Sequence, residues 1–120
     1  MPVLEVALIE PTKGMVIRAP ALLDTGADFV FFGSQYADAL NVDWKNAPKL
    51  TFGGINSPGQ EGYAVDLRLV IAATRHGWPA RIIFSPTMNR EPFPLLGREG
   101  FFDHCEARFN TVKREFRLKC

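Results

Sequence analysis

The stretch PALLDTGADFVFFG, residues 20–33, carries the most specific pattern in this 120-residue sequence. Leu22 and Leu23 precede Asp24, and a run of four apolar residues follows a second carboxylate, Asp28. A carboxylate in such apolar surroundings is costly unless another group pairs with it or uses its charge. The stretch therefore predicts a buried strand that ends in a functional aspartate.

The composition predicts one globular domain over residues 1–120 and excludes several function classes. Hydrophobic residues make up 47% of the chain, which is enough for a core. The formal net charge is +1 and the basic residues are scattered, so neither nucleic acid nor an acidic membrane is expected as a partner. No apolar run approaches the ~18 residues of a membrane span. The first residues lack the basic flank of a signal peptide, so we expect a cytoplasmic protein.

The two cysteines, Cys105 and Cys120, are predicted to be free thiols. They form no C-x-x-C motif, and free thiols are usual in cytosolic proteins. A tether between two chains through Cys120 is the alternative. His104 precedes Cys105, but neighbours on a helix face apart, so no metal site is expected there.

Short apolar segments separated by proline and glycine predict an all-β fold. Alternation over residues 64–71 gives one of these strands an apolar face and a wet face. Ser34 is predicted to cap a short helix over 34–40, and a second short helix is expected within 98–107. The expected strands cover residues 3–9, 15–23, 49–54, 62–73, 80–84, 92–97, 108–110 and 114–118.

The triplet Asp24-Thr25-Gly26 suits amide hydrolysis by paired carboxylates. Hydrolysis needs a base that activates water and an acid that protonates the carbonyl oxygen. Two carboxylates about 3 Å apart share one proton and supply both, because they cannot both ionise. Thr25 offers a hydroxyl that braces the loop, and Gly26 lets the backbone come close. Taken alone, the triplet is also typical of a turn after a strand.

In these features the sequence resembles the retroviral-type aspartic proteases, the retropepsins. The resemblance rests on LLDTGAD at residues 22–28, a glycine-rich hairpin near 53–59 and LLGR at 95–98, in the order and spacing of the family. It implies an all-β, closed-barrel-like fold with one or two short helices and one lobe per chain. It also implies a homodimer that hydrolyses peptides or proteins without a metal or other cofactor.

The resemblance also assigns roles to individual residues. Asp24 would be the catalytic aspartate, and Thr25 and Gly26 would support it. Arg98 would form a structural ion pair with Asp28. The residues that would bind substrate are Ala27, Asp28, Gly53, Gly54 and Ile55. The last three fall where the family has a mobile hairpin, the flap, which residues 56–58 make longer or stiffer here.

The sequence contains one Asp-Thr-Gly triplet, so the second carboxylate is expected from Asp24 of a second copy related by a two-fold axis. Two alternatives stay open. One is a dimeric peptide-binding or assembly module of the same fold that cleaves weakly or not at all. The other is a domain excised from a larger protein. Fold does not decide among these functions.

Overall fold

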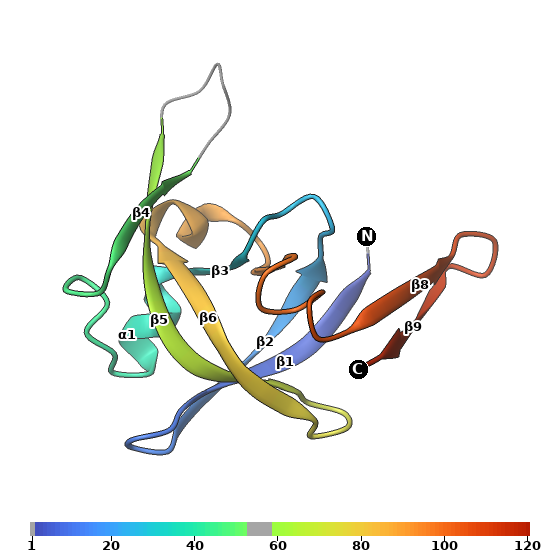
Figure 1. Cartoon of the computed structure of the whole chain (residues 1–120), viewed down its shortest axis with the longest axis horizontal. Helices are drawn as coiled ribbons and strands as arrows, with labels where there is room; N and C mark the ends of the chain where they lie inside the picture. The colour runs from blue at the N-terminus through green and yellow to red at the C-terminus, as the bar shows by residue number, and fades with distance from the viewer. Residues whose placement is uncertain (1, 53–58) are drawn as a thin grey trace.

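The structure is a computed structural model that describes residues 2–52 and 59–120, in which strands predominate (Figure 1). Alternating side chains form these strands, since successive residues of a strand face opposite sides of the sheet. The elements in the described ranges are β1 (Val3–Glu10), β2 (Met15–Leu23), β3 (Val30–Gly33), α1 (Ser34–Ala39), β4 (Lys49–Phe52), β5 (Gln60–Ile71), β6 (Gly77–Ser85), the 3₁₀-helix η1 (Pro86–Arg90), β7 (Leu95–Leu96), β8 (Glu106–Asn110) and β9 (Glu115–Lys119).

Within the described residues, seven strands form one sheet in the order β1-β2-β7-β3-β6-β5-β4. The long strand β5 pairs with β4 through its first residues, with β6 along its middle and with β1 through its last residues. The β1–β5 pairing closes the sheet into a ring, which leaves β4 attached to β5 outside it. The prediction of an all-β fold with short helices is confirmed.

Two parallel pairings position the segment of the DTG triplet. Leu22–Leu23 at the end of β2 pair with Leu95–Leu96 of β7, and β3 pairs in parallel with residues 82–85 of β6. β7 also pairs antiparallel with β3 at Phe31. Because β7 lies between β2 and β3, the loop 24–29 that joins those two strands has to pass over the end of β7.

The core draws apolar residues from every strand of the ring and from α1. Phe32, Phe84 and Phe101 are among the largest fully buried side chains, and each contributes about 1.5–3 kcal/mol of burial free energy. Both tryptophans are buried as well. Their indole N–H groups are satisfied: Trp44 Nε1 donates to Asp38 Oδ1 (2.8 Å), and Trp78 Nε1 donates to the Gly100 carbonyl (2.7 Å).

The two helix predictions are wrong in part. Ser34 begins α1 instead of capping it, and Gly33 holds the cap position. The Ser34 hydroxyl accepts a hydrogen bond from Asn89 Nδ2 (3.0 Å), a partner distant in sequence. Residues 98–104 form turns instead of a helix, because Gly100 has φ +101° and interrupts the helical backbone, and Glu106 and Ala107 begin β8.

Proline limits one expected strand and starts one element that the sequence did not predict. The strand expected over 92–97 is reduced to the two residues of β7, because Pro92 and Pro94 have no N–H for a ladder. Pro86 occupies the first turn of η1, where a missing N–H costs nothing. Ser85 Oγ caps this short helix by accepting from the Thr87 N–H (3.3 Å).

The prediction of free thiols is wrong, because Cys105 and Cys120 form a disulfide. Strands β8 and β9 pair antiparallel, with Glu106 opposite Lys119, so the two cysteines form the next pair at the base of this hairpin. Their Cα atoms lie 4.0 Å apart. Cytosolic reductants keep most thiols reduced, so a disulfide is unusual in a cytoplasmic protein. The cytoplasmic location stays a prediction.

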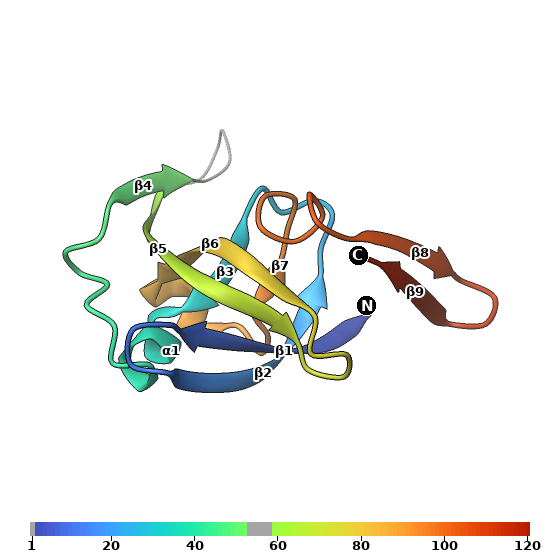
Figure 2. The same cartoon turned by 60° about the horizontal axis from the view of Figure 1, so that its bottom comes forward.

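The hairpin β8–β9 forms a sheet of its own and projects from the ring (Figures 1 and 2). One of its faces carries Ala107, Phe109, Phe116 and Leu118, which oppose one another in the register. Phe116 and Leu118 pack against the core, whereas Phe109 is 45% exposed. No helix in residues 2–52 and 59–120 has the length and apolar character needed to cross a membrane.

Candidate active site

Asp24 begins the loop that follows β2, and backbone hydrogen bonds hold it there. Its N–H donates to the Leu96 carbonyl (3.0 Å), and its carbonyl accepts from the Ala27 N–H (3.1 Å). Its side chain is half-buried, and Oδ1 accepts from the Gly26 N–H (2.9 Å). The carboxylate is therefore oriented by its own loop, with a backbone donor directed at it.

The segment after β7 supports this loop from beneath. The Arg98 N–H donates to the Ala27 carbonyl (2.9 Å), and the Glu99 N–H donates to the Asp28 carbonyl (2.9 Å). A Cβ on Gly97 would collide with the Phe29 carbonyl oxygen and lie 2.6 Å from that of Ala27. Only glycine fits at this position, which explains the third residue of the LLGR motif.

Most of the predicted site residues meet in this loop. Thr25, Gly26 and Asp28 are exposed in the single chain, and Ala27 is half-buried. A Cβ on Gly26 would lie 3.2 Å from Asp24 Oδ1, tighter than ordinary van der Waals contact. A side chain there would press on the carboxylate, so glycine preserves the position of Asp24.

Arg98 and Asp28 lie together, as the sequence predicted, with Nη2 3.4 Å from Oδ1. The two side chains are 65% and 73% exposed. An ion pair with this much exposure to water contributes at most about 1 kcal/mol to stability. In the single chain this pair orients two side chains more than it stabilises the fold.

The predicted flap falls between β4 and β5 in the sequence. Gly53, Gly54 and Ile55, which the sequence assigned to substrate binding there, lie outside the described residues. At the base of the hairpin, Lys49 Nζ lies 2.8 Å from Glu61 Oε1. The hydrogen bond and the charge of Glu61 raise the pKa of Lys49.

An aromatic chain joins this hairpin to the loop. The Phe52 ring on β4 lies 4.7 Å from that of Phe31 on β3, and Phe31 meets Phe29 edge to face at 5.9 Å. The sequence analysis missed Phe52 as a site residue. It had no local signal, because only the tertiary structure brings the Phe52 ring next to that of Phe31.

No group of three or more His, Cys, Asp or Glu residues in the described part of the chain could hold a metal ion. The absence of a metal or other cofactor from the chemistry stays a prediction.

Comparison with known proteins identifies the fold. No protein-family model matches the sequence, and no curated protein matches it. Among solved structures, a retropepsin-like aspartic protease from Rickettsia conorii matches over 98% of this chain and 89% of its own, with 15% identity and a TM-score of 0.63. The EIAV protease complexed with the inhibitor HBY-793 matches over 81% of each chain, with 19% identity and a TM-score of 0.52. The chain has the retropepsin fold.

A third solved structure agrees. The Simian Foamy Virus (mac) protease matches over 81% of this chain and 88% of its own, with 17% identity and a TM-score of 0.50. At these identities the likeness establishes the retropepsin fold, and function depends on the residues of the site. The candidate site in this chain consists of the loop 24–29 and the segment 97–99 that supports it.

Proposed function

We propose that this protein is an aspartic endopeptidase that works as a homodimer, with one Asp24 from each chain in a shared active site. The observation that carries the proposal is the oriented Asp24 carboxylate, held by the Gly26 N–H at 2.9 Å in a loop of a retropepsin fold. The chain contains a single Asp-Thr-Gly triplet. A second carboxylate of the same kind therefore has to come from a second copy.

In the proposed reaction the two Asp24 carboxyl groups share one proton. The ionised group takes a proton from water as the water oxygen attacks the peptide carbonyl carbon, and the protonated group gives its proton to the carbonyl oxygen. The resulting diol returns a proton to the pair while the leaving nitrogen receives one, and the C–N bond breaks. One water is consumed and the pair again holds one proton.

The other loop residues have supporting roles in this proposal. The exposed Thr25 hydroxyl is available to brace the loop of the second copy, and Gly26 allows the two loops to approach. The half-buried Ala27 and the exposed side chain of Asp28 are available for substrate. Arg98 holds the side chain of Asp28.

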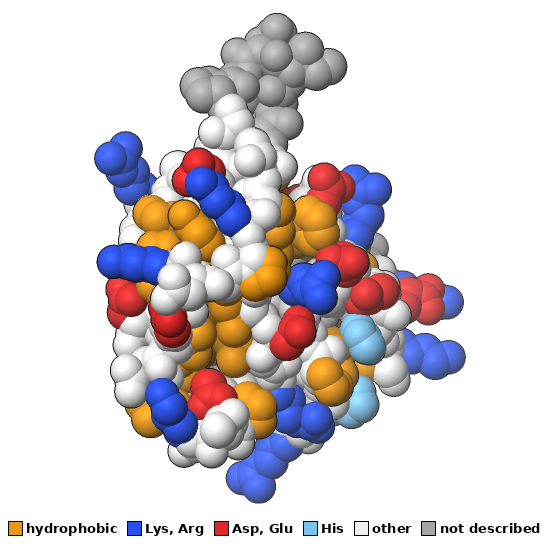
Figure 3. Space-filling view, turned by 60° about the vertical axis from the view of Figure 1, so that its left-hand side comes forward, with side chains coloured by type: hydrophobic (Ala, Val, Ile, Leu, Met, Phe, Trp, Pro, Cys, Tyr) orange, Lys and Arg blue, Asp and Glu red, His pale blue; other side chains and the backbone are white. Residues whose placement is uncertain are grey.

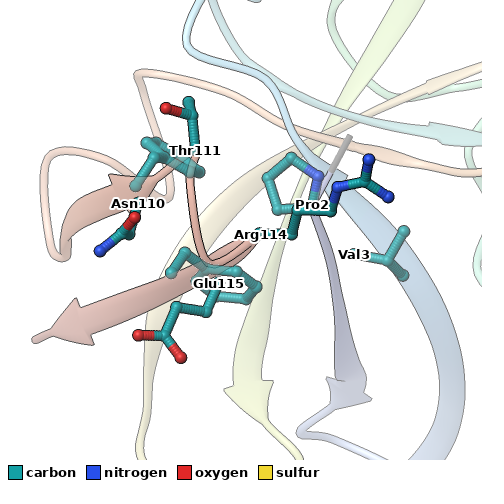
Figure 4. Close-up of a pocket in the computed structure, with 8 residues that line it drawn as sticks. Pro2, Val3, Asn110, Thr111, Arg114 and Glu115 are labelled. Carbon is teal, nitrogen blue, oxygen red and sulfur yellow. The ribbon is translucent and has the colours of Figure 1, made fainter.

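A groove beside the loop provides a surface for the second copy. The Leu23 N–H, next to Asp24, donates to the Pro2 carbonyl (3.0 Å), so the N-terminal strand starts close to the site. Pro2 and Val3 face the β8–β9 hairpin across a groove of about 660 Å³ that Phe109 and Phe116 also line (Figure 4). This groove does not include Asp24, which suits a contact between subunits better than a substrate site.

The N-terminal strand also offers backbone for pairing. β1 pairs with β5 from Val6 to Ile9, and the Glu5 carbonyl accepts from the Ala72 N–H (3.1 Å), so among the described residues Val3 and Leu4 pair with β2 alone. Such an edge accepts another strand, and Val3 is 40% exposed. Backbone pairing and apolar contact could thus act together in a two-fold dimer.

Cleavage of a mixed decapeptide library tests the proposal, with fragments identified by mass spectrometry. The wild-type protein should cleave the library, and Asp24→Asn should lose at least about a hundredfold in rate, because an amide cannot share the proton. Circular dichroism should show the same fold for both proteins. Cleavage that survives the substitution would refute Asp24 as the catalytic residue. A dimer that binds peptides without cleaving them would favour the alternative of a binding or assembly module.

A further inference from the structure

A pocket of about 420 Å³ lies beside the loop, next to Phe29 and Glu99. We call it the Phe29 pocket. Its apolar lining comes from the buried or half-buried side chains of Phe29, Leu50, Ala64 and Ile83. Exposed charged residues, among them Glu99, complete the lining. Figure 3 shows patches of hydrophobic side chains among charged side chains of both signs on the side of the molecule that carries β4.

The charged side chains around the Phe29 pocket form ion pairs, except for one carboxylate. Lys49 pairs with Glu61 at 2.8 Å, and Arg81 pairs with Asp66 at 3.4 Å. Arg98, next to Glu99 in sequence, pairs with Asp28. In the part of the chain that the structure describes, Glu99 has no ion-pair partner. Three basic and four acidic side chains thus give this region a net negative charge, located at Glu99.

The pocket is continuous with the loop of the candidate active site. Phe29 and Glu99 form a parallel bridge, and the Glu99 N–H donates to the Asp28 carbonyl (2.9 Å). A peptide extended along residues 27–29 would direct alternate side chains to the same side, about 7 Å apart. One side chain of such a peptide, a few residues from the bond at Asp24, therefore reaches the Phe29 pocket.

We propose that the Phe29 pocket binds a lysine or arginine side chain of the substrate and that Glu99 determines this specificity. Lysine and arginine combine an apolar stem with a charged end. The stem matches Phe29, Leu50 and Ile83, and the charged end matches the carboxylate that lacks a partner. The proposal rests on the proposed function, since the pocket is assigned to the substrate of that active site.

Matched peptides test this assignment. The cleaved decapeptides from the library are resynthesised with Lys, norleucine or Glu at each position within four residues of the scissile bond. At one position the wild-type protein should prefer Lys over norleucine in kcat/KM by about two- to fivefold, the range of an exposed ion pair. The preference should lie mainly in KM, because the contact is equal in the ground and transition states.

Variants of Glu99 separate specificity from a structural role. Glu99→Gln should abolish the preference for Lys, and Glu99→Lys should reverse it toward Glu at the same position. Glu91→Gln is the matched control, because Glu91 is an exposed glutamate outside the pocket, and it should keep the wild-type profile. A preference that is absent in the wild type, or unchanged in Glu99→Gln, would overturn the proposal.

A binding measurement distinguishes this outcome from failure of the proposed function. Two fluorescein-labelled decapeptide pools, one with a fixed Lys and one with a fixed norleucine, are titrated into Asp24→Asn protein with and without Glu99→Gln. Binding is measured by fluorescence anisotropy. Tighter binding of the Lys pool that is lost with Glu99→Gln supports the pocket even if the wild type cleaves nothing. Equal binding of both pools would refute the pocket, whatever the cleavage assay shows.

Discussion

The loop 24–29 and the β8–β9 hairpin are held in place by different means. The loop is fixed by backbone hydrogen bonds to residues some seventy positions later in the sequence, such as Asp24 N–H to the Leu96 carbonyl and Arg98 N–H to the Ala27 carbonyl. In the described residues the hairpin strands pair only with each other, and a disulfide closes their base. The loop thus depends on the whole ring, whereas the hairpin depends on local and covalent structure.

Gly97→Ala should have the largest effect on this comparison, because it acts where the ring meets the loop. The new Cβ would press on the carbonyl groups of Ala27 and Phe29, and backbone cannot yield as a flexible side chain does. We expect a loss of about 3 kcal/mol or more in the free energy of unfolding, at the upper end for overpacking. Urea denaturation followed by tryptophan fluorescence measures it.

Gly14→Ala is the control for this prediction. Gly14 has φ +70° and nothing within 4 Å of a Cβ, so the substitution strains the backbone without a collision and should cost about 1–2 kcal/mol. Equal losses for the two variants would show that crowding beneath the loop is not what requires glycine at position 97.

Removal of the disulfide should affect the hairpin and spare the loop. In the double variant Cys105→Ser, Cys120→Ser, the hairpin loses a bond that closes a 15-residue segment, which is worth about 3 kcal/mol. A two-stranded hairpin alone is marginally stable. Hydrogen exchange should therefore rise in residues 106–119, while the amide protons of Asp24 and Arg98 stay protected.

The exchange pattern decides whether the two regions are independent. Exchange that rises equally in the hairpin and in the loop would contradict the separation between them. Unchanged exchange in the hairpin would show that packing of Phe116 and Leu118 on the core holds it without the disulfide.

Mixing of subunits sharpens the comparison, because the loop is fixed within one chain while its proposed chemistry needs two. Wild-type and Asp24→Asn proteins are mixed in equal amounts and allowed to exchange. Random pairing leaves about a quarter of the dimers with two Asp24 residues, so activity should fall to about a quarter of that of an all-wild-type sample. A value of one half, with exchange verified by tagged chains, would place a complete site in each chain.

The smallest expected effect concerns two turns that have the same geometry but differ in charge. The Glu10 carboxylate accepts from the N–H groups of Thr12 and Lys13 in the β1–β2 turn (2.9 and 2.8 Å). The Asn110 amide oxygen accepts from the Val112 and Lys113 N–H groups at the hairpin tip, both at 3.1 Å.

Only the Glu10 turn should depend on pH. The backbone N–H groups of Thr12 and Lys13 lower the pKa of Glu10 below 4.5. The stabilisation is therefore present above the unfolded-state pKa and is lost as the pH falls through the lower folded-state value. The melting temperatures of wild type and Glu10→Gln should differ at neutral pH and converge in acid, whereas the effect of Asn110→Ala should be independent of pH. A Glu10→Gln difference that does not shrink as the pH falls would contradict this assignment.

Local signals in the sequence were sufficient for most of the ring strands, but they missed β3 (Val30–Gly33). The predicted range of residues 15–23 coincides with β2, and the expected helix and C-terminal hairpin are present with shifted boundaries. The resemblance carried by LLDTGAD and LLGR predicted that Arg98 pairs with Asp28, and in the structure these two side chains lie 3.4 Å apart. The backbones of the two segments are also in contact. Hydrophobic alternation and turn residues specify strands because each acts on neighbours in the chain.

Features that depend on distant residues were decided by the tertiary structure. The Cys105–Cys120 disulfide follows from the register of β8 and β9, since a shift of one residue would turn the two side chains to opposite faces. Phe52 lies beside Phe31 because its strand, β4, pairs with β5, which belongs to the ring. The charge left at Glu99 emerges only once three ion pairs from separate strands and loops have formed. The sequence by itself determined which residues are proposed to carry the chemistry. The closed ring determined which of their neighbours shape the site, because contacts between distant segments exist only after the chain has folded.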